Sequence, residues 1–414
     1  MKKRVFISMH YLELGGAEMS LIGLLQAMDY SRYEVDLFVH RHQGELMRLV
    51  PKEVRLLPEI TAYASIESPL MEAIRKGQFG VAWGRMIAKW QFRKYQSKDA
   101  SKPQCAIYQY IAQEVESFLP SLEQYGEYDL AISFLQPHNY VLSKVKAKKK
   151  VCWIHTDYTK VEFDTEAELP VWAAYDHIVS ISPDVTKTFL RVFPSLENKI
   201  VEIENILSSE FVRKRAGEKD VTKEMPKGEG RVNLLSVGRF TDAKNYDNVP
   251  DICRQINSQL STLRSAFGCS QGENSQLSIR WYIVGYGDEA LIRQKIHEAG
   301  MEEHVILLGK RTNPYPYMMA CDIYAQPSRY EGKSVTVREA QMLCKPVVVT
   351  NYPTAKSQIQ NGVDGVIVPL DNEGCAKGIA EFVLNRGLQQ QIMGYLHEHD
   401  YGNVDEVTKI DCLI

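Results

Sequence analysis

The sequence lacks any closely spaced pair of cysteines. Its 414 residues contain eight cysteines, and no two of them form a CxxC motif. This spacing argues against a zinc site and a disulfide framework, and it suits a reducing cytosol. The chain also lacks an excess of charge of either sign, because its formal net charge is −3 at pH 7. No overall field therefore points to nucleic acid as a partner.

Long hydrophobic runs are missing as well. No stretch approaches the ~20 apolar residues that a membrane span needs. The basic N-terminus, MKKRVFISM, carries an apolar run of only about five residues, whereas a signal peptide has roughly 7–15. We therefore expect a cytoplasmic protein. The composition, with 44% hydrophobic and 24% charged residues, is that of a globular protein, and the length predicts two domains of roughly 200 residues each.

Both halves of the chain alternate short buried-type strands with helices. Strand, helix and strand in this order form a βαβ unit, which implies a parallel sheet with right-handed crossovers. In the first half, a helix is predicted at 15–28 and strands at 4–9, 33–40, 129–135, 149–155 and 177–182. In the second half, strands are predicted at 231–240, 279–287, 304–309, 321–328, 345–351 and 365–369. We predict an α/β fold with two doubly wound domains and a ligand cleft between their strand ends.

The domain boundaries follow from composition. We expect an N-terminal domain at 1–205 and a C-terminal domain at 231–395. Residues 206–230, rich in Lys, Arg, Glu and Gly, read as the linker between them. Residues 396–414 are predicted to form a terminal helix, because apolar side chains recur there at helical spacing. Periodicity leaves open which domain this helix contacts, and packing back onto the N-terminal domain is one alternative.

The stretch SRYEGKSVTVREAQ gathers groups that can bind an anion. It follows a strand and opens a helix predicted to begin at Ser334 or Thr336, where free N–H groups and the positive dipole end favour negative charge. Gly332 lets a ligand approach the backbone closely. Glu331 could accept hydrogen bonds from sugar hydroxyls, and Glu339 from a second polyol such as a ribose. Considered alone, the stretch also fits a capped helix with two solvated glutamates.

Two further loops carry groups suited to phosphate. SVGRFTDAKNYDN ends a strand and supplies Arg239 and Lys244, a guanidinium fork and an ammonium point charge that together suit a diphosphate. LGGAE places Gly15 and Gly16 after the first strand of the other half, where a glycine turn permits close backbone approach to phosphate. Each signal is weak by itself, because most such pairs and turns have no ligand.

Taken together, these elements resemble glycosyltransferase family 4. The resemblance runs over nearly the whole chain and is strongest at 232–384, and IENILSSEF and NYPTAKSQIQNGVDGVIVP resemble further segments of the family. The family's E-x7-E, GR…K and glycine-turn elements are matched by Glu331 and Glu339, Arg239 and Lys244, and Gly15 and Gly16. The resemblance implies the GT-B architecture, in which two facing Rossmann-like domains enclose a cleft. The N-terminal domain would bind the acceptor and the C-terminal domain the nucleotide sugar.

The resemblance also implies catalytic roles for four residues. Arg239 and Lys244 would bind the donor diphosphate and stabilise the charge of the leaving nucleotide, in place of a metal ion. Glu331 would hold hydroxyls of the donor sugar. His155, in the segment WIHTDY, would line the reaction centre, and a structural histidine at a strand end is the alternative.

Further donor contacts are implied around these groups. Glu339 would contact the ribose, and the segment after ILLG would lie near the base. The expected donor-binding residues, besides Arg239, Lys244 and Glu331, are Gly15, Gly16, Lys310, Arg311, Gly332, Lys333, Ser334, Val335, Thr336 and Glu339. The family element usually resembles EGFGLPxLEA, whereas this chain has EGKSVTVREA, so that Lys333 replaces an aromatic or small residue and Ser334 a glycine. This departure leaves the donor sugar open.

The implied reaction is a retaining sugar transfer by front-side attack through an oxocarbenium-like state. The leaving diphosphate takes the proton of the acceptor, so no pair of carboxylates needs to flank the bond as in glycosidases. We expect no cofactor and no metal, a UDP- or GDP-linked donor, and a glycan or polyprenyl-diphosphate-linked acceptor in cell-surface polysaccharide assembly.

Residues 75–98 bear on the acceptor, since they contain seven basic residues and no acidic one. The apolar side chains at helical spacing are Trp83, Met86, Ile87 and Trp90, and another face carries Arg85, Lys89 and Arg93. A basic amphipathic helix with tryptophans can lie on an anionic membrane. This predicts peripheral contact with the inner face of the cell membrane and suits a lipid-carried acceptor. In the alternative, the apolar side packs into the first domain.

Other function classes remain as alternatives. A nucleotide-sugar epimerase of the same architecture would need acid and base residues near C2 of the sugar, and no convincing set is present. A dinucleotide-dependent oxidoreductase would show G-x-G-x-x-G after its first strand, which GGAEMS does not match. A non-catalytic nucleotide-sugar-binding or scaffold protein stays open, because binding and catalysis share these residues.

Overall fold

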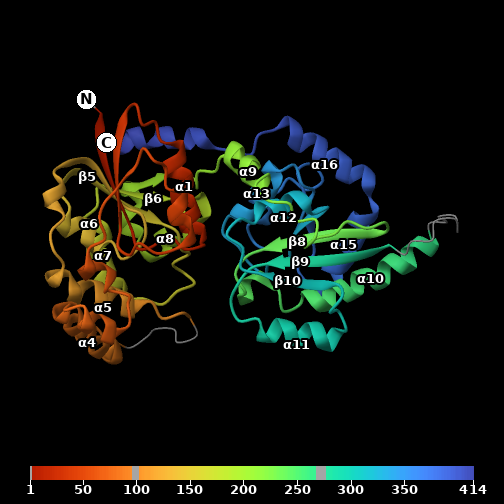
Figure 1. Ribbon diagram of the computed structural model, residues 1–414, viewed down its shortest axis with the longest axis horizontal. Helices are drawn as coiled ribbons and strands as arrows, with labels where there is room; N and C mark the ends of the chain where they lie inside the picture. The colour runs from red at the N-terminus through yellow and green to blue at the C-terminus, as the bar shows by residue number, and fades with distance from the viewer. Residues whose placement is uncertain (1, 96–101, 267–276) are drawn as a thin grey trace. The chain divides into compact units, whose positions relative to one another are not determined.

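The computed structural model describes residues 2–95, 102–266 and 277–414, with the backbone alone at 262–266. The chain forms two compact units, one comprising Met1–Leu207 with Asn403–Ile414 and the other Ser208–Gly402 (Figure 1). Each unit is an α/β layer structure built on a parallel sheet. The predicted α/β fold with two Rossmann-like parallel sheets is therefore confirmed.

The first unit contains seven strands in the order β3-β2-β1-β4-β5-β6-β7. Its strands are β1 (Lys3–Met9), β2 (Tyr33–Val39), β3 (Arg55–Leu56), β4 (Tyr128–Ser133), β5 (Ala147–Ile154), β6 (His177–Ser180) and β7 (Ile200–Glu202). Its α-helices are α1 (Gly16–Ala27), α2 (Thr61–Ala64), α3 (Leu70–Arg75), α4 (Phe79–Lys94), α5 (Ala106–Val115), α6 (Asn139–Lys144), α7 (Thr165–Ala173) and α8 (Pro183–Val192). Short 3-10 helices occupy η1 (Glu45–Leu49), η2 (Glu116–Phe118), η3 (Glu123–Tyr125) and η4 (Pro194–Lys199).

The second unit contains six strands in the order β10-β9-β8-β11-β12-β13. These are β8 (Arg231–Val237), β9 (Ser278–Val284), β10 (Val305–Gly309), β11 (Ile323–Gln326), β12 (Val347–Thr350) and β13 (Val366–Val368). The helices are α9 (Ser209–Ala216), η5 (Asp242–Lys244), α10 (Val249–Ala266), α11 (Ala290–Ala299), α12 (Tyr315–Ala320), α13 (Val335–Met342), α14 (Ala355–Gln358), α15 (Asn372–Leu384) and α16 (Arg386–Glu398).

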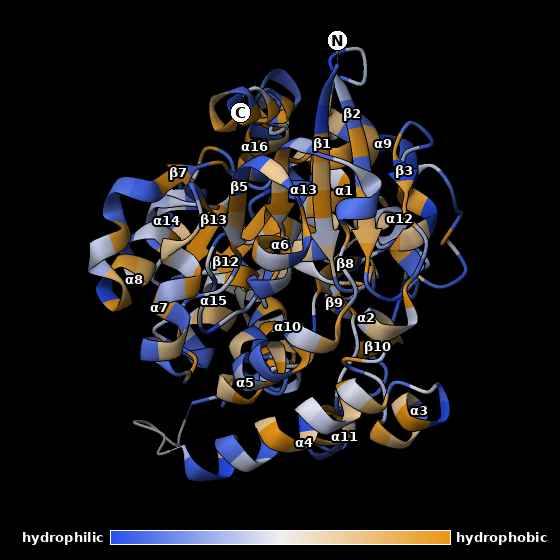
Figure 2. Ribbon diagram, turned by 90° about the vertical axis from the view of Figure 1, so that its left-hand side faces the viewer, coloured by the Kyte–Doolittle hydropathy of each residue, from blue (hydrophilic) through white to orange (hydrophobic). Residues whose placement is uncertain are grey.

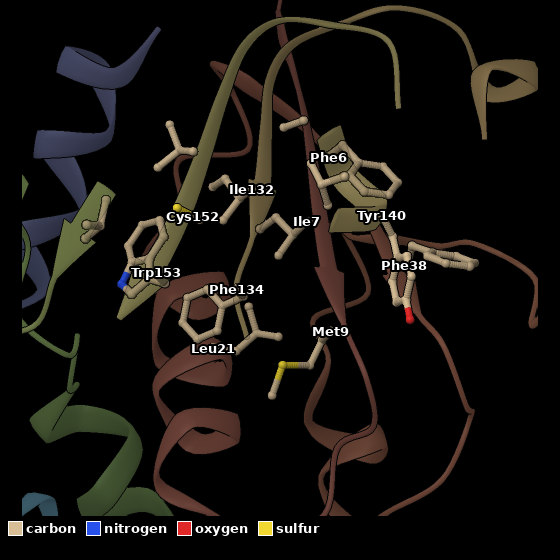
Figure 3. Close-up of a cluster of buried hydrophobic side chains, with 14 of the residues drawn as sticks. Phe6, Ile7, Met9, Leu21, Phe38, Ile132, Phe134, Tyr140, Cys152 and Trp153 are labelled. Atoms are coloured by element: carbon tan, nitrogen blue, oxygen red, sulfur yellow. The ribbon is translucent and has the colours of Figure 1, made fainter. Parts of the chain in front are cut away.

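The central strands are buried on both faces, as their continuous apolar runs predict. Figure 2 shows orange, hydrophobic residues concentrated in the strands and blue residues over the outer helices. In the core of the first unit, Phe6 and Ile7 of β1 are fully buried, and the rings of Phe134 and Trp153 stack with centroids 5.2 Å apart (Figure 3). Close packing of this kind holds the carboxyl ends of the strands in fixed positions.

Every strand predicted from the sequence is present, and two are new. Strands β3 and β7 have two and three residues and lie at the two edges of the first sheet. Strands this short have no readable alternation, which explains why the sequence did not reveal them.

The boundary between the units differs from the expected one. Residues 208–230, expected as a linker, belong to the second unit. Helix α9 lies there, with Val212 buried and Arg213 Nε donating to the carbonyl of Met342 at 3.2 Å. The charged composition that suggested a linker serves ion pairs instead, since Glu224 contacts both Lys219 and Arg311.

The C-terminal segment also differs from a single helix at 396–414. Helix α16 ends at Glu398, and a 3-10 helix, η6 (Val404–Leu413), follows after a break. Residues 403–414 are part of the first unit, where Ile410 and Leu413 join its hydrophobic core. Arg32 contacts the carboxylate of Asp411 at 2.8 Å. The apolar repeat that suggested a helix therefore marks the buried side of this segment.

Candidate functional site

Two loops of the second unit meet through an ion pair. Lys244, at the end of η5, follows β8, and Glu331 lies between β11 and α13. Lys244 Nζ stands 2.7 Å from Glu331 Oε1, and the two side chains are 19% and 12% exposed. Because β8 and β11 are neighbours in the sheet, the loops at their carboxyl ends are adjacent. The structure thus brings together the two motifs that the sequence placed 87 residues apart.

A hydrogen-bond network fixes the position of Glu331. Gln326 Nε2 and Ser328 Oγ both donate to Glu331 Oε1, at 2.8 and 2.5 Å, and both residues are fully buried. Thr354 Oγ1 donates to the backbone carbonyl of Glu331 at 2.9 Å. A carboxylate with three donors on one oxygen is held in a single orientation, which a group that selects hydroxyl positions requires.

The N-terminus of α13 lies directly beyond this carboxylate. Ser334 is at the N-cap position, but its side chain does not cap the helix and lies 3.2 Å from Thr336 Oγ1. The amide of Ser334 donates to Gln358 Oε1 at 3.0 Å, and Gln358 Nε2 donates to the Ser334 carbonyl at 2.6 Å. The helix start at Val335 is therefore held by a side chain from α14 rather than by its own cap. Helix amides without a cap bind anions well.

Gly332 adds open space beside the ion pair. It is exposed, and a Cβ atom built on it would meet no heavy atom within 4 Å. The protein itself therefore does not require a glycine there, and the open space lets a ligand approach the backbone closely. Lys333, the neighbouring departure from the family element, is half-buried.

Glu339 has a different environment from the one expected for a ribose contact. It is 3% exposed, and its Oε1 accepts a hydrogen bond from Tyr315 Oη at 2.7 Å. Burial raises the pKa of Glu339 to about 7, against the lowering effects of Tyr315 and Arg215. The carboxyl group is thus engaged inside the second unit. No motif signalled Tyr315 or Arg215, because their approach depends on how α12 and α9 pack on α13.

Three other cations predicted for the donor site, Arg239, Lys310 and Arg311, follow strands β8 and β10 of the second sheet. The side chain of Arg239 is exposed and forms no hydrogen bond or ion pair among the described residues. Arg311 Nε donates to Tyr317 Oη at 2.9 Å, and its Nη2 lies 3.0 Å from Glu224. Lys310 Nζ lies 5.1 Å from the ring centroid of Tyr286. Both follow β10, two strands from β8 and so about 10 Å away across the sheet. The structure does not group them with Lys244.

The predicted residues of the first unit lie at the carboxyl edge of its own sheet. Gly15 is the N-cap of α1 and Gly16 its first residue, while His155 directly follows β5. The ring of His155 packs 4.8 Å from that of Phe134. Burial lowers the pKa of His155 to about 4, so the imidazole is neutral at pH 7. The predicted site residues are thus divided between the two units, and among them the structure shows Lys244 in contact with Glu331.

Sequence reasoning missed three further histidines beside His155. Four neighbouring strands, β2, β1, β4 and β5, are followed by His40, His10, His138 and His155. His10 and His40 stack with ring centroids 4.8 Å apart, and His10 Nδ1 lies 2.7 Å from Glu67 Oε1. Burial lowers the pKa of His40, and lowers that of His138 to about 3. The repeated pattern of a buried strand followed by histidine, in ISMH, LFVH and CWIH, was the available signal.

These histidines do not form a metal centre in the part of the chain that the structure describes. No group of three or more His, Cys, Asp or Glu side chains there could hold a metal ion. Burial lowers the pKa of His40, His138 and His155, and a neutral imidazole offers one donor and one acceptor, which suits contact with hydroxyl groups.

Comparison with known proteins connects the second unit to a family. Residues 218–396 match the family model described as glycosyl transferases group 1. This region contains the Lys244–Glu331 pair and the start of α13. The match therefore covers most of the second unit.

Three curated relatives align over shorter stretches. A 4-alpha-N-acetylgalactosaminyltransferase of Campylobacter jejuni, whose name specifies N-acetylgalactosamine-N,N'-diacetylbacillosaminyl-diphospho-undecaprenol as acceptor, is 34% identical over 117 residues, 25% of this chain and 32% of its own. The lipopolysaccharide core mannosyltransferase LpsB of Rhizobium meliloti is 27% identical, over 20% of this chain and 24% of its own. The amylovoran biosynthesis glycosyltransferase AmsD of Erwinia amylovora is 24% identical, over 41% and 44%. The chain thus aligns with less than half of each relative's length.

Solved structures match the fold over the full chain. Alr3699/HepE of Anabaena, in complex with UDP-glucose, superposes with a TM-score of 0.63 at 15% identity and covers 100% of both chains. WaaG, a glycosyltransferase involved in lipopolysaccharide biosynthesis, gives a TM-score of 0.60 at 13% identity over 99% of both chains. At these identities the likeness establishes the fold, which is that of GT-B glycosyltransferase structures.

Proposed function

We propose that this protein is a retaining glycosyltransferase of family 4, which transfers a hexosyl-type sugar from a nucleotide-diphosphate sugar to a glycan or lipid-linked acceptor. One observation carries the proposal. Lys244 and Glu331 are in contact beside the uncapped start of α13, within the region that matches group 1 glycosyl transferases. The cation and the free helix amides can bind a diphosphate, and the fixed carboxylate beside them can bind hydroxyls of a sugar.

The roles of these groups follow from their chemistry. Lys244 and the amides at Val335 and Thr336 bind the donor diphosphate, and the exposed guanidinium of Arg239 adds a forked donor. As the sugar–phosphate bond breaks, negative charge grows on the leaving phosphate, and positive groups already in place stabilise it. The glycosidic bond forms on the same face, and the leaving phosphate accepts the proton of the acceptor hydroxyl. Fixed cations and amide dipoles therefore replace a metal ion.

Glu331 selects the sugar. Its Oε1 is saturated by Lys244, Gln326 and Ser328, while hydroxyls of the donor can reach Oε2. The solved complex of HepE with UDP-glucose supports a UDP-linked donor for this chain, and a GDP-linked donor is the alternative. Gly332 leaves room for the sugar ring beside the backbone.

The acceptor is proposed from the names of the relatives. They act on an undecaprenol-diphosphate-linked glycan, on a lipopolysaccharide core and in amylovoran synthesis. All three names concern the synthesis of a glycan, and one of them specifies a polyprenyl-diphosphate carrier, so we propose a glycan or polyprenyl-diphosphate-linked acceptor in cell-surface polysaccharide assembly. In the described residues, no helix is both long and apolar enough to cross a bilayer. We place the protein in the cytoplasm, in peripheral contact with the inner membrane face through residues 75–98, of which 96–98 lie outside the described residues.

The test is a screen of purified protein against a panel of UDP- and GDP-sugars, measuring donor binding and slow donor hydrolysis. One or two donors should bind and release nucleotide diphosphate, with retention at the anomeric carbon. Binding without turnover in the presence of lipid-linked acceptors would favour a scaffold, and conversion of the sugar at C2 would favour an epimerase.

Removal of divalent metal tests the source of the positive charge. EDTA should leave donor turnover within about twofold of its untreated value, because Lys244 and the helix amides supply the charge. A strict requirement for Mg²⁺ would contradict this assignment. The transferase proposal itself would survive that result.

A further inference from the structure

Helix α4 carries its large apolar side chains on its outer face. Phe79, Trp83, Met86 and Trp90 are 67%, 57%, 44% and 54% exposed. Their spacing of four, three and four residues places them along one stripe of the helix. Met71 of the adjacent α3 is 61% exposed as well. Single exposed apolar residues are common, but a continuous stripe of this size marks an interaction surface.

The inner face of the same helix is made of small residues. The side chains buried on it are Val81, Ala82, Gly84 and Ala88. A Cβ atom on Gly84 would lie 2.6 Å from the carbonyl oxygen of Glu114, and one on Gly80 would overlap the ring of Phe118. Helix α4 therefore lies as close to α5 as its backbone allows. The bulky residues are outside because the inner face has no room for them.

Unneutralised cations accompany the stripe. Lys89, Arg93 and Lys94 are exposed, and Lys94 Nζ lies 3.3 Å from the ring centroid of Trp90. In the described chain, Lys89 and Arg93 form no ion pair. The sequence holds no acidic residue from Arg75 to Tyr95. Figure 2 shows orange and blue segments alternating along α4.

A second basic stretch of the first unit gives the contrast. In KVKAKKK, Lys148 is paired with Asp129 at 2.7 Å and Lys149 with Asp176 at 3.0 Å. Lys146 lies 3.6 Å from Glu127. These cations are neutralised by the protein, whereas those of α4 face solvent beside tryptophans.

One expected member of the cationic face is absent from it. Arg85 was predicted to line the polar face with Lys89 and Arg93. Instead its Nη1 donates to the carbonyls of Ser65 and Ser68, at 3.0 and 2.6 Å. Arg85 therefore anchors α4 to the rest of the first unit. Helical spacing alone could not reveal this, because a guanidinium can turn inward to meet free carbonyls.

We propose that α4 docks on an anionic lipid bilayer, with Phe79, Trp83, Met86 and Trp90 in the interfacial region and Lys89, Arg93 and Lys94 on the lipid phosphates. Tryptophan prefers the level of the headgroups, and a cationic amphipathic helix lies in the interface plane. Charge complementarity selects this partner, since a protein partner would need a matching acidic, apolar groove. The purpose of this docking, which is to hold the enzyme where a lipid-linked acceptor is presented, rests on the proposed function.

The chain provides its own spectroscopic probe for this contact. Of its five tryptophans, Trp153, Trp172 and Trp281 are at most 4% exposed. Only Trp83 and Trp90 can therefore meet lipid. Phosphatidylglycerol vesicles should shift tryptophan emission of the full chain to shorter wavelength, and brominated acyl chains should quench it. Phosphatidylcholine vesicles should cause neither change.

Variants assign the binding to the stripe and its cations. Trp83→Ser with Trp90→Ser should abolish co-sedimentation with anionic vesicles, while Leu291→Ser, at a half-exposed leucine of α11, should leave it unchanged. Lys89→Gln and Arg93→Gln should each weaken partitioning about fivefold. Lys146→Gln removes the same charge from a paired site and should have little effect.

Several results would overturn the proposal. One is the absence of a tryptophan emission shift with anionic vesicles. Another is vesicle binding by the double serine variant that equals that of the unmodified chain. Loss of a self-associated state in that variant, without any vesicle binding by the unmodified chain, would assign the stripe to a protein interface instead. Donor hydrolysis without vesicles should be unchanged in all α4 variants. A chain that turns over no donor but still binds anionic vesicles would contradict the transferase proposal and leave the membrane proposal intact.

Discussion

The two sheets present opposite chemistry at their carboxyl ends. In the second unit the edge carries formal charges, with Lys244 against Glu331 and the free guanidinium of Arg239 nearby in sequence. In the first unit it carries histidines, which follow four adjacent strands, and burial lowers the pKa of His40, His138 and His155. The same fold thus supplies an exposed cation and an ion pair on one unit and buried imidazoles on the other.

Replacement of Lys244 by Ala should have the largest effect on the charged edge. Turnover of the nucleotide-sugar donor should fall by about 10²–10³-fold, as for loss of one preorganised group that stabilises transition-state charge. Steady-state kinetics with the donor from the screen would measure it. Circular dichroism should show an intact fold, because Lys244 is partly exposed.

Lys310→Ala is the matched control for this prediction. It removes a lysine after a strand of the same sheet, two strands away. Its effect should be at least tenfold smaller than that of Lys244→Ala. Equal losses would mean that the charge of the whole edge matters, rather than the contact with Glu331.

Replacement of Glu331 by Gln should have the next largest effect. The amide is nearly the same size, but it loses the ion pair with Lys244 and its charge-assisted hydrogen bonds to hydroxyls. Hydrogen bonds to charged groups contribute about 1.5–3 kcal/mol, so kcat/KM should fall roughly 10–150-fold. Affinity for the free nucleotide diphosphate should hardly change. A parallel loss of nucleotide affinity would show that Glu331 acts only by orienting Lys244.

The sequence predicted the strands and the meeting of the two motifs for a simple physical reason. Strands buried on both faces are continuous apolar runs, and adjacent parallel strands bring the loops at their ends together. Other features depended on tertiary packing. The hydrogen bond from Tyr315 to Glu339 requires α12 to pack on α13. Arg85 turns inward because the backbone carbonyls of Ser65 and Ser68 lie within hydrogen-bonding distance of its guanidinium.

The orientation of α4 is the clearest example of a feature that the sequence could not predict. Helical spacing grouped its aromatic residues on one face but could not say whether that face points inward. Gly80 and Gly84 decide it, because their lack of side chains lets the opposite face approach Phe118 of η2 and the backbone of α5. The small residues, rather than the large ones, held the information.

Acidification should act on the two units in opposite directions. Burial lowers the pKa of His138 to about 3 and of His155 to about 4. Since unfolded histidine titrates near 6.5, the unfolded state binds more protons below that pH, and the first unit loses stability as pH falls. Glu339 has its pKa raised to about 7. Its folded form binds more protons between about 4.3 and 7, so the second unit gains stability as pH falls.

Hydrogen-exchange protection factors at pH 7.0 and 5.5 would resolve the units separately. Each group should contribute up to about 1.4 kcal/mol per pH unit within its window. The raised pKa of Glu168 opposes the histidines in the first unit, so single variants are needed. His138→Gln should flatten the response of the first unit, and Glu339→Gln that of the second. If neither variant changed the pH dependence of stability in its unit, the assignment of that dependence to His138 and Glu339 would be wrong.

The smallest effect is expected at two glycines, one at each edge. Gly332→Ala meets no atom within 4 Å, so the free energy of unfolding should stay within about 0.5 kcal/mol, while donor affinity falls if a ligand approaches there. Gly15→Ala instead overlaps the carboxylate of the buried Glu18, so it should destabilise the first unit by roughly 1 kcal/mol. Urea unfolding and donor titration separate the two outcomes. Unchanged donor affinity in Gly332→Ala would mean that the open space beside the ion pair is not where the sugar binds, and the position of the donor would have to be sought elsewhere along the charged edge.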